Sequence, residues 1–103
     1  MYTSQAQVAT AAASRYLVQL CKHWAHKLDV EYTTETARIK FPSGLCRMKA
    51  GADDLLLIVE AADADTVTRL QSVVEDHLRR FAFREELGAF AWTNGVAALA
   101  SER

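Results

Sequence analysis

Apolar residues recur at helical spacing in a first stretch near the amino end of the chain. One stripe is predicted to face the core, formed by Leu17, Leu20, Cys21, Trp24 and Leu28. Ser14 precedes this stripe and is the expected N-cap, because its hydroxyl can accept a hydrogen bond from a free backbone amide of the first turn. The pattern therefore predicts a helix that begins after Ser14 and runs to about Leu28.

A second stretch with the same spacing lies in the carboxyl half. Its apolar stripe consists of Val67, Leu70, Val74, Leu78 and Phe81. Asp63 is the expected N-cap, and Asp65 adds a negative charge near the positive end of the helix dipole. We expect this helix to end near Phe81 and to cover the same sheet face as the first helix.

Between the helices the pattern changes to alternation, which is typical of β-strands. Three strands are predicted, with inward-facing residues Val30 and Tyr32, then Ala37, Ile39 and Phe41, then Cys46 and Met48. Turns are expected at residues 33–36 and 42–44, where Pro42 fixes φ and Gly44 tolerates unusual φ values. A nearly continuous apolar run at residues 55–59 predicts a fourth strand in the sheet interior.

The two ends of the chain differ in character. Residues 5–10 predict a short edge strand with Ala6 and Val8 facing inward. Residues 82–92 are too apolar for a free tail, so we expect a docked turn or short strand there. The alanine-rich residues 93–103 are predicted to form a flexible tail.

The order strand, helix, four strands, helix predicts an α+β fold. We expect a two-layer sandwich in which one antiparallel sheet carries two helices on one face and leaves the other face open. This arrangement is similar to half of the TATA-binding protein and to the terminal domain of phosphohexomutases. With 103 residues, the chain has room for one domain, predicted at residues 1–92.

Composition and charge narrow the function classes. Half of the residues are hydrophobic and the formal net charge is −1, as in a globular protein without the basic surface of a nucleic-acid binder. The amino end lacks a secretory leader pattern, and no apolar run has the length of a membrane span. We therefore expect a cytoplasmic protein with no nucleic-acid or membrane partner, and with Cys21 and Cys46 as reduced, buried thiols.

The segment Cys21-Lys-His-Trp-Ala-His-Lys27 suggests a metal site, but its helical geometry disfavours one. His23 and His26 lie three positions apart on the solvent side, whereas Cys21 lies about 140–160° from them in the core stripe at 100° per residue. Zinc sites use three or four protein ligands, so His23 and His26 alone are weak metal candidates. His77 is expected at the edge of the second apolar stripe, near Leu70 and Phe81. No cofactor is expected, with a bound metal ion as the less favoured alternative.

Basic residues form a second candidate site on the open sheet face, where four are expected to project from adjacent strands: Arg38, Lys40, Arg47 and Lys49. Like charges across a ladder repel one another, so these side chains need acidic partners or a bound anion. Glu31, Glu35 and Glu60 are the available partners. Arg84, with Arg79 and Arg80, extends the basic set near the end of the second helix, where the helix dipole favours cations in any case.

Motifs of common enzyme classes are missing from the sequence. It contains no glycine-rich phosphate loop, nucleophile elbow or HExxH motif. Lys22 and Lys27 are the lysines considered for a Schiff base, but both are expected on a solvated face with nothing to lower their pKa.

Five segments together carry a family resemblance: Ser14-Arg-Tyr-Leu, Cys21-Lys-His-Trp-Ala-His-Lys27, Ile39-Lys-Phe-Pro-Ser-Gly-Leu-Cys46, Glu60-Ala-Ala-Asp-Ala-Asp65 and His77-Leu-Arg-Arg-Phe-Ala-Phe-Arg-Glu85. Over residues 5–92 the chain resembles a small bacterial family known as domain of unknown function 2218. The resemblance implies a setting beside siderophore-interacting flavin-dependent ferric reductases, and some relatives carry an aldolase label. No residue of this chain supports the aldolase label.

Two hypotheses of different classes follow. The first is a non-catalytic accessory or binding domain in iron or siderophore handling, which meets a siderophore-interacting flavoprotein or a small anionic ligand. The second is a small enzyme, metal-dependent or lyase-like, that uses His23, His26, His77 and Glu85 and requires them to converge in one cleft. A homodimer formed through the open sheet or an edge strand is a third alternative.

Overall fold

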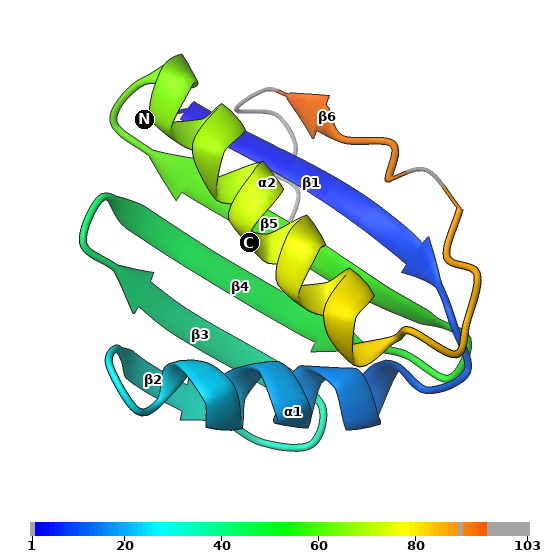
Figure 1. The fold of residues 1–103 in the computed structure, drawn as a ribbon. Helices are drawn as coiled ribbons and strands as arrows, with labels where there is room; N and C mark the ends of the chain where they lie inside the picture. The colour runs from blue at the N-terminus through cyan, green and yellow to red at the C-terminus, as the bar shows by residue number, and fades with distance from the viewer. Residues whose placement is uncertain (1, 89, 95–103) are drawn as a thin grey trace.

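The computed structural model describes residues 2–88 and 90–94, and its elements follow the predicted order with one strand added (Figure 1). The elements are β1 (Tyr2–Ala9), α1 (Ala13–Trp24), β2 (Asp29–Tyr32), β3 (Thr36–Phe41), β4 (Gly44–Ala50), β5 (Asp54–Ala61), α2 (Ala64–Phe81) and β6 (Thr93–Asn94). The predicted α+β fold is confirmed.

The strands form one antiparallel sheet in the order β2-β3-β4-β5-β1-β6. The predicted edge position of β1 is wrong, because β1 pairs along its length with β5 and, at Ser4 and Gln5, with β6. β1 also begins earlier than predicted, at Tyr2. Its first half contains the buried polar residues Thr3 and Ser4, which the search for apolar alternation does not detect.

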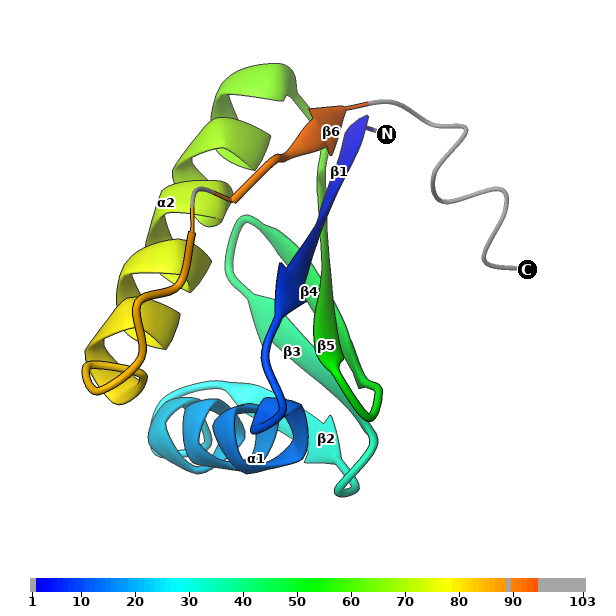
Figure 2. The same ribbon diagram turned by 90° about the vertical axis from the view of Figure 1, so that its right-hand side faces the viewer.

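Both helices pack on the same face of the sheet, as Figure 2 shows. The core lies between the two layers and is lined by fully buried side chains from both helices and the central strands: Leu17, Leu20, Ile39, Leu55, Leu57, Val74 and Leu78. Burying each such side chain contributes about 1.5–3 kcal/mol, so this one face accounts for the cohesion of the domain. Among the described residues, no helix lies on the opposite sheet face. No helix within residues 2–88 and 90–94 has the length and hydropathy to cross a membrane.

The two ends of α1 differ from the prediction. Ser14 is not the N-cap; Ala12 holds that position, and the Ser14 hydroxyl donates instead to the Thr34 carbonyl at 2.6 Å. Thr10 takes over part of the capping role, since its Oγ1 accepts from the Ala12 amide at 3.1 Å. The helix ends at Trp24, whose carbonyl accepts from the amides of both Lys27 and Leu28, at 3.0 and 2.8 Å, in the turn that leads to β2.

The bounds of α2 agree with the prediction. Asp63 caps the helix, and its Oδ1 accepts from the Thr66 amide at 2.8 Å. This hydrogen bond favours the charged carboxylate and lowers the pKa of Asp63.

The segment after α2 docks along the helix and returns to the sheet. Arg79 donates to the carbonyls of Leu87 and Gly88 at 3.1 and 3.0 Å, and its guanidinium lies 4.6 Å from the centre of the Phe90 ring. The docking predicted for residues 82–92 is thus present. Strand β6 shows that Thr93 and Asn94 also belong to the domain rather than to the predicted tail, whose residues 95–103 lie outside the described part of the chain.

Candidate functional site

The open sheet face collects the four basic residues predicted for it. Arg38 and Arg47 face each other directly across β3 and β4, while Lys40 and Lys49 lie in the neighbouring rows, opposite Leu45 and Thr36. The residues between them in sequence are buried on the helix side, namely Ala37, Ile39, Cys46 and Met48. The alternation therefore places the four cations on the solvent side of the sheet.

Two of the predicted acidic partners reduce the repulsion between Arg38 and Arg47. Arg38 lies 3.7 Å from Glu31, with both side chains more than half exposed. Arg47 lies 3.8 Å from Glu60, which is only 12% exposed. Exposed ion pairs such as Arg38–Glu31 contribute little to stability. The pair of Arg47 and Glu60 is therefore the stronger ion pair on this face. Across the described ranges, Lys40, Lys49 and Glu35 form no ion pair within 4.0 Å.

Arg47 nevertheless lacks the hydrogen bonds that a guanidinium normally makes. Its Nε and Nη2 atoms are buried and have no hydrogen-bond partner among the described residues. The carboxylate of Glu60 attracts Nε from 3.8 Å, but this separation is too long for a hydrogen bond. A buried polar group left without a partner costs about 1–3 kcal/mol, and more when it is charged.

Gln5 has the complementary deficiency in the same row of the sheet. Arg47 pairs with Ile58, Ile58 pairs with Gln5, and the side-chain Oε1 of Gln5 is buried with no partner in the described part of the chain. Among the described residues, this row of the sheet therefore has two unpaired donors on Arg47 in β4 and one unpaired acceptor on Gln5 in β1, two strands away. Arg47 is predictable from the sequence but Gln5 is not, because alternation assigns a residue to a sheet face and does not identify the strand beside it.

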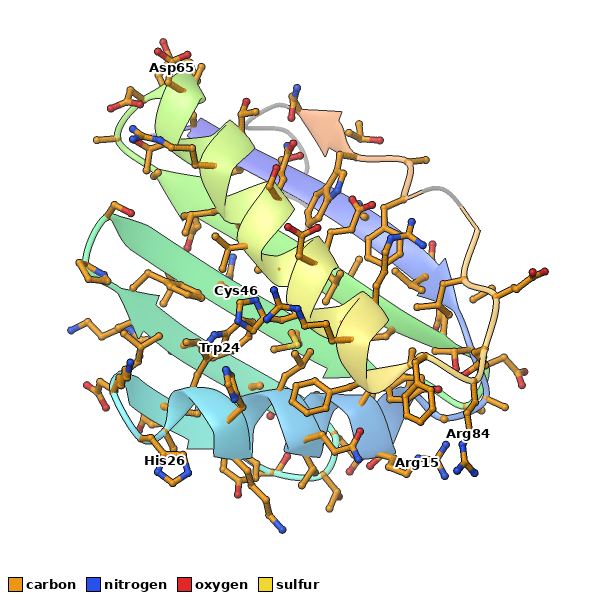
Figure 3. The ribbon with its side chains drawn as sticks, in the orientation of Figure 1. Arg15, Trp24, His26, Cys46, Asp65 and Arg84 are labelled. Carbon is orange, nitrogen blue, oxygen red and sulfur yellow. The ribbon has the colours of Figure 1, made fainter. Side chains whose placement is uncertain are left out.

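Arg84 lies apart from these four cations. It follows α2, its guanidinium lies 5.4 Å from the ring centre of the exposed Phe83, and Figure 3 shows it at the end of the molecule where α1 begins. The candidate anion-binding residues are thus divided between the open sheet face and the helical layer.

The three histidines group differently from the predicted pairing. His23 and His26 are both exposed, as expected, but His26 lies in the turn beyond the end of α1, and Figure 3 shows it on the side of that helix away from α2. His23 instead contacts the half-buried His77 of α2, with ring centres 5.2 Å apart. Within the described residues, no group of three or more His, Cys, Asp or Glu side chains is placed to hold a metal ion.

Glu85, the acidic member of the hypothetical enzyme site, is engaged elsewhere. Its Oε1 accepts hydrogen bonds from the hydroxyls of Thr10, at 3.0 Å, and Tyr16, and this interaction together with burial raises the pKa of Tyr16. Tyr16 and His23 are seven residues apart on α1, which corresponds to about 10 Å along a helix axis. Glu85 therefore ties the segment after α2 to the start of α1 and does not join the histidines near its end.

Both cysteines are free, fully buried thiols, in agreement with the prediction. Burial raises the pKa of Cys21 to about 11 and also raises the pKa of Cys46. Since the thiolate is the reactive form, neither group is suited to nucleophilic chemistry near neutral pH.

These features define a small two-layer α+β domain in which the sheet face opposite the helices carries charged groups and polar groups that have no partner among the described residues. The chain belongs to a family described as an uncharacterized protein conserved in bacteria (DUF2218), whose model matches residues 5–93. It is similar to PA4090 from Pseudomonas aeruginosa, known from an NMR structure: the two are 38% identical, the match covers 92% of this chain and 96% of that one, and the TM-score is 0.74. No curated protein matches the chain significantly. The family resemblance is confirmed.

Proposed function

We propose that this protein is a non-catalytic binding domain that uses its open sheet face to bind an anionic ligand. The observation that carries the proposal is the row from Arg47 to Gln5, in which buried donors and a buried acceptor have no partner among the described residues. Native proteins rarely leave such groups unpaired, and a bound ligand is one way to satisfy them.

The chemistry of the row limits the class of ligand. A guanidinium presents a planar set of donors that matches carboxylate and phosphate oxygens, and Lys40 and Lys49 in the flanking rows add positive charge. Gln5 requires a donor in return. A ligand that carries both an anionic oxygen and an N–H or O–H group satisfies both ends of the row. Arg47 is about one-third exposed, so its guanidinium can turn toward such a ligand.

The biological setting we propose is cytoplasmic iron and siderophore handling beside a siderophore-interacting flavoprotein. Family resemblance supports this setting, and so does ligand chemistry: flavin mononucleotide combines a phosphate with ring carbonyl and N–H groups, and many siderophores present anionic oxygens. The domain would then act as an accessory that holds a flavin, a siderophore or an acidic surface of the flavoprotein.

A small metal-dependent or lyase-like enzyme remains the second candidate. The contact between His23 and His77 favours it, since two histidines do meet between the helices. The positions of His26 and Glu85 weigh against it, because neither joins that pair. The binding function therefore ranks first.

Titration of the purified protein with flavin mononucleotide, a ferric siderophore and pyrophosphate by calorimetry tests the binding function. We expect at least one of them to bind with micromolar affinity, and Arg47→Gln to weaken that affinity by about 10- to 100-fold, since hydrogen bonds to charged groups contribute about 1.5–3 kcal/mol. Arg84→Gln is the matched control, because it removes an arginine outside the sheet face, and it should leave the affinity unchanged.

Circular dichroism of both variants confirms that they are folded. Absence of binding by all three compounds, or an equal loss in Arg47→Gln and Arg84→Gln, would contradict the proposed function.

A further inference from the structure

Helices α1 and α2 each bring one histidine to their junction, on the side of the sheet opposite to Arg47. His23 and His77 meet there with ring centres 5.2 Å apart and ring planes inclined by 47°. We propose that this pair is a two-nitrogen binding site for a borderline divalent transition metal such as Ni²⁺ or Zn²⁺, with water or an external ligand in the remaining positions. The proposal is independent of the proposed function.

The separation of the rings suits two ligands of one ion. Metal–nitrogen bonds to histidine are about 2.0–2.1 Å, and the ring centre lies about 1.2 Å behind the nitrogen, so each ring centre sits about 3.2 Å from the ion. At a tetrahedral angle, two such rings have centres about 5 Å apart. The observed spacing of 5.2 Å is close to this value.

The hydrogen bond of His77 determines which of its two ring nitrogens keeps a lone pair. Its Nδ1 lies 2.7 Å from the carbonyl oxygen of Val73, and because a carbonyl only accepts, Nδ1 carries the proton and donates. In the neutral ring, Nε2 then keeps its lone pair. Histidine ligands in proteins usually donate their second ring N–H to a carbonyl or carboxylate in this way, which fixes the tautomer and the ring orientation.

The histidine pair packs against aromatic side chains on one side and is exposed to solvent on the other. Trp24 packs 5.2 Å from the ring of His77, and Phe81 packs edge-on 5.8 Å from the ring of His23. His23 itself is exposed, so an ion can approach from solvent and its side chain can turn to present a nitrogen. Neither histidine pairs with an acidic side chain within the described ranges.

Imidazole is a preferred ligand of zinc, nickel and copper, whereas magnesium prefers oxygen donors. With two protein ligands the affinity should be well below that of a four-ligand structural zinc site. The open positions would let the ion hold a further donor atom, so the pair is an exchangeable site rather than a structural one.

Calorimetry on the full chain without a histidine tag tests the site with Ni²⁺, Zn²⁺ and Mg²⁺. We expect one equivalent of Ni²⁺ or Zn²⁺ to bind and Mg²⁺ not to bind. His23→Gln and His77→Gln should each weaken binding at least tenfold. His26→Gln is the matched control, an exposed histidine three residues from His23 but outside the pair, and it should bind as the parent does.

A second measurement guards against a folding defect in His77→Gln. In the parent protein, Zn²⁺ should shift the Nε2 resonance of His77 in a long-range ¹H–¹⁵N spectrum and leave the His26 resonances in place. The proposal is overturned if the parent does not bind, if His26→Gln loses as much affinity as His23→Gln, or if the His77 resonance does not move. Arg47→Gln should retain full metal affinity, so failure here and failure of the anion-binding function are separately visible.

Discussion

At the scale of single residues, Arg47 and His23 show how neighbours decide what a polar side chain can do. Arg47 has an acidic neighbour, Glu60, but its buried Nε and Nη2 remain without hydrogen bonds among the described residues. His23 is exposed, as the sequence predicts, and its ring also contacts His77 of α2. At 100° per residue, His23 lies only about 60° from Leu20, at the margin of the apolar stripe, whereas His26 lies about 120° away. His23 therefore lies at the edge of the apolar stripe of α1 that faces α2, where it contacts His77.

The buried thiols of Cys21 and Cys46 are expected to be unreactive in the folded protein. At pH 8 a thiol with a pKa of about 11 is ionised to roughly one part in a thousand, so Cys21 should be inert in the folded protein, and Cys46 likewise because its pKa is also raised. A colorimetric disulfide reagent should label neither cysteine in native buffer at pH 8 and both in denaturant. Rapid labelling of one cysteine in the native protein would show that the burial of that thiol is wrong.

At the scale of elements, the helices and strands were predictable where one face is apolar, and the ends were not. The stripes of both helices and the alternation of β3 and β4 are fixed by burial, which leaves a periodic signal. Ser14 is not the N-cap because α1 begins one residue before it, at Ala13, and its hydroxyl donates to the Thr34 carbonyl. Asp63 is the N-cap, as predicted, because α2 begins only three residues after the end of β5 and Asp63 directly precedes its first residue.

Arg79 connects α2 to the segment that follows it, so we expect this side chain to stabilise the domain. It bonds the carbonyls of Leu87 and Gly88 and pairs with Glu75 at 3.1 Å. Lysine cannot reproduce this forked geometry, so Arg79→Lys should lower the free energy of unfolding by about 1–3 kcal/mol. Arg80→Lys, at the exposed neighbouring position, should change it by less than about 0.5 kcal/mol. Urea unfolding measures both, and equal effects would contradict this role for Arg79.

At the scale of the whole molecule, the open sheet face emerges from the strand order. The sequence indicated which residues face outward, but it contained no signal that β1 pairs with β5, some 50 residues away, or that Gln5 and Arg47 share a row. The same limit applies to His23 and His77, which meet only because both helices lie on one face of the sheet. The local hydrophobic pattern predicted the helical layer and the sheet. Both candidate sites depend on contacts between residues far apart in the sequence, which that pattern does not indicate.

The open sheet face is proposed to bind an anionic ligand. A ¹H–¹⁵N NMR titration with flavin mononucleotide tests it most directly, because the spectrum reports every backbone amide together with the Gln5 side-chain amide and Arg47 Nε. We expect the shifts to gather on β3, β4, β5 and β1 and to include both of these side-chain groups. Shifts confined to α1 and α2 would contradict this proposal, and so would the absence of shifts with flavin mononucleotide, the ferric siderophore and pyrophosphate alike at millimolar concentration.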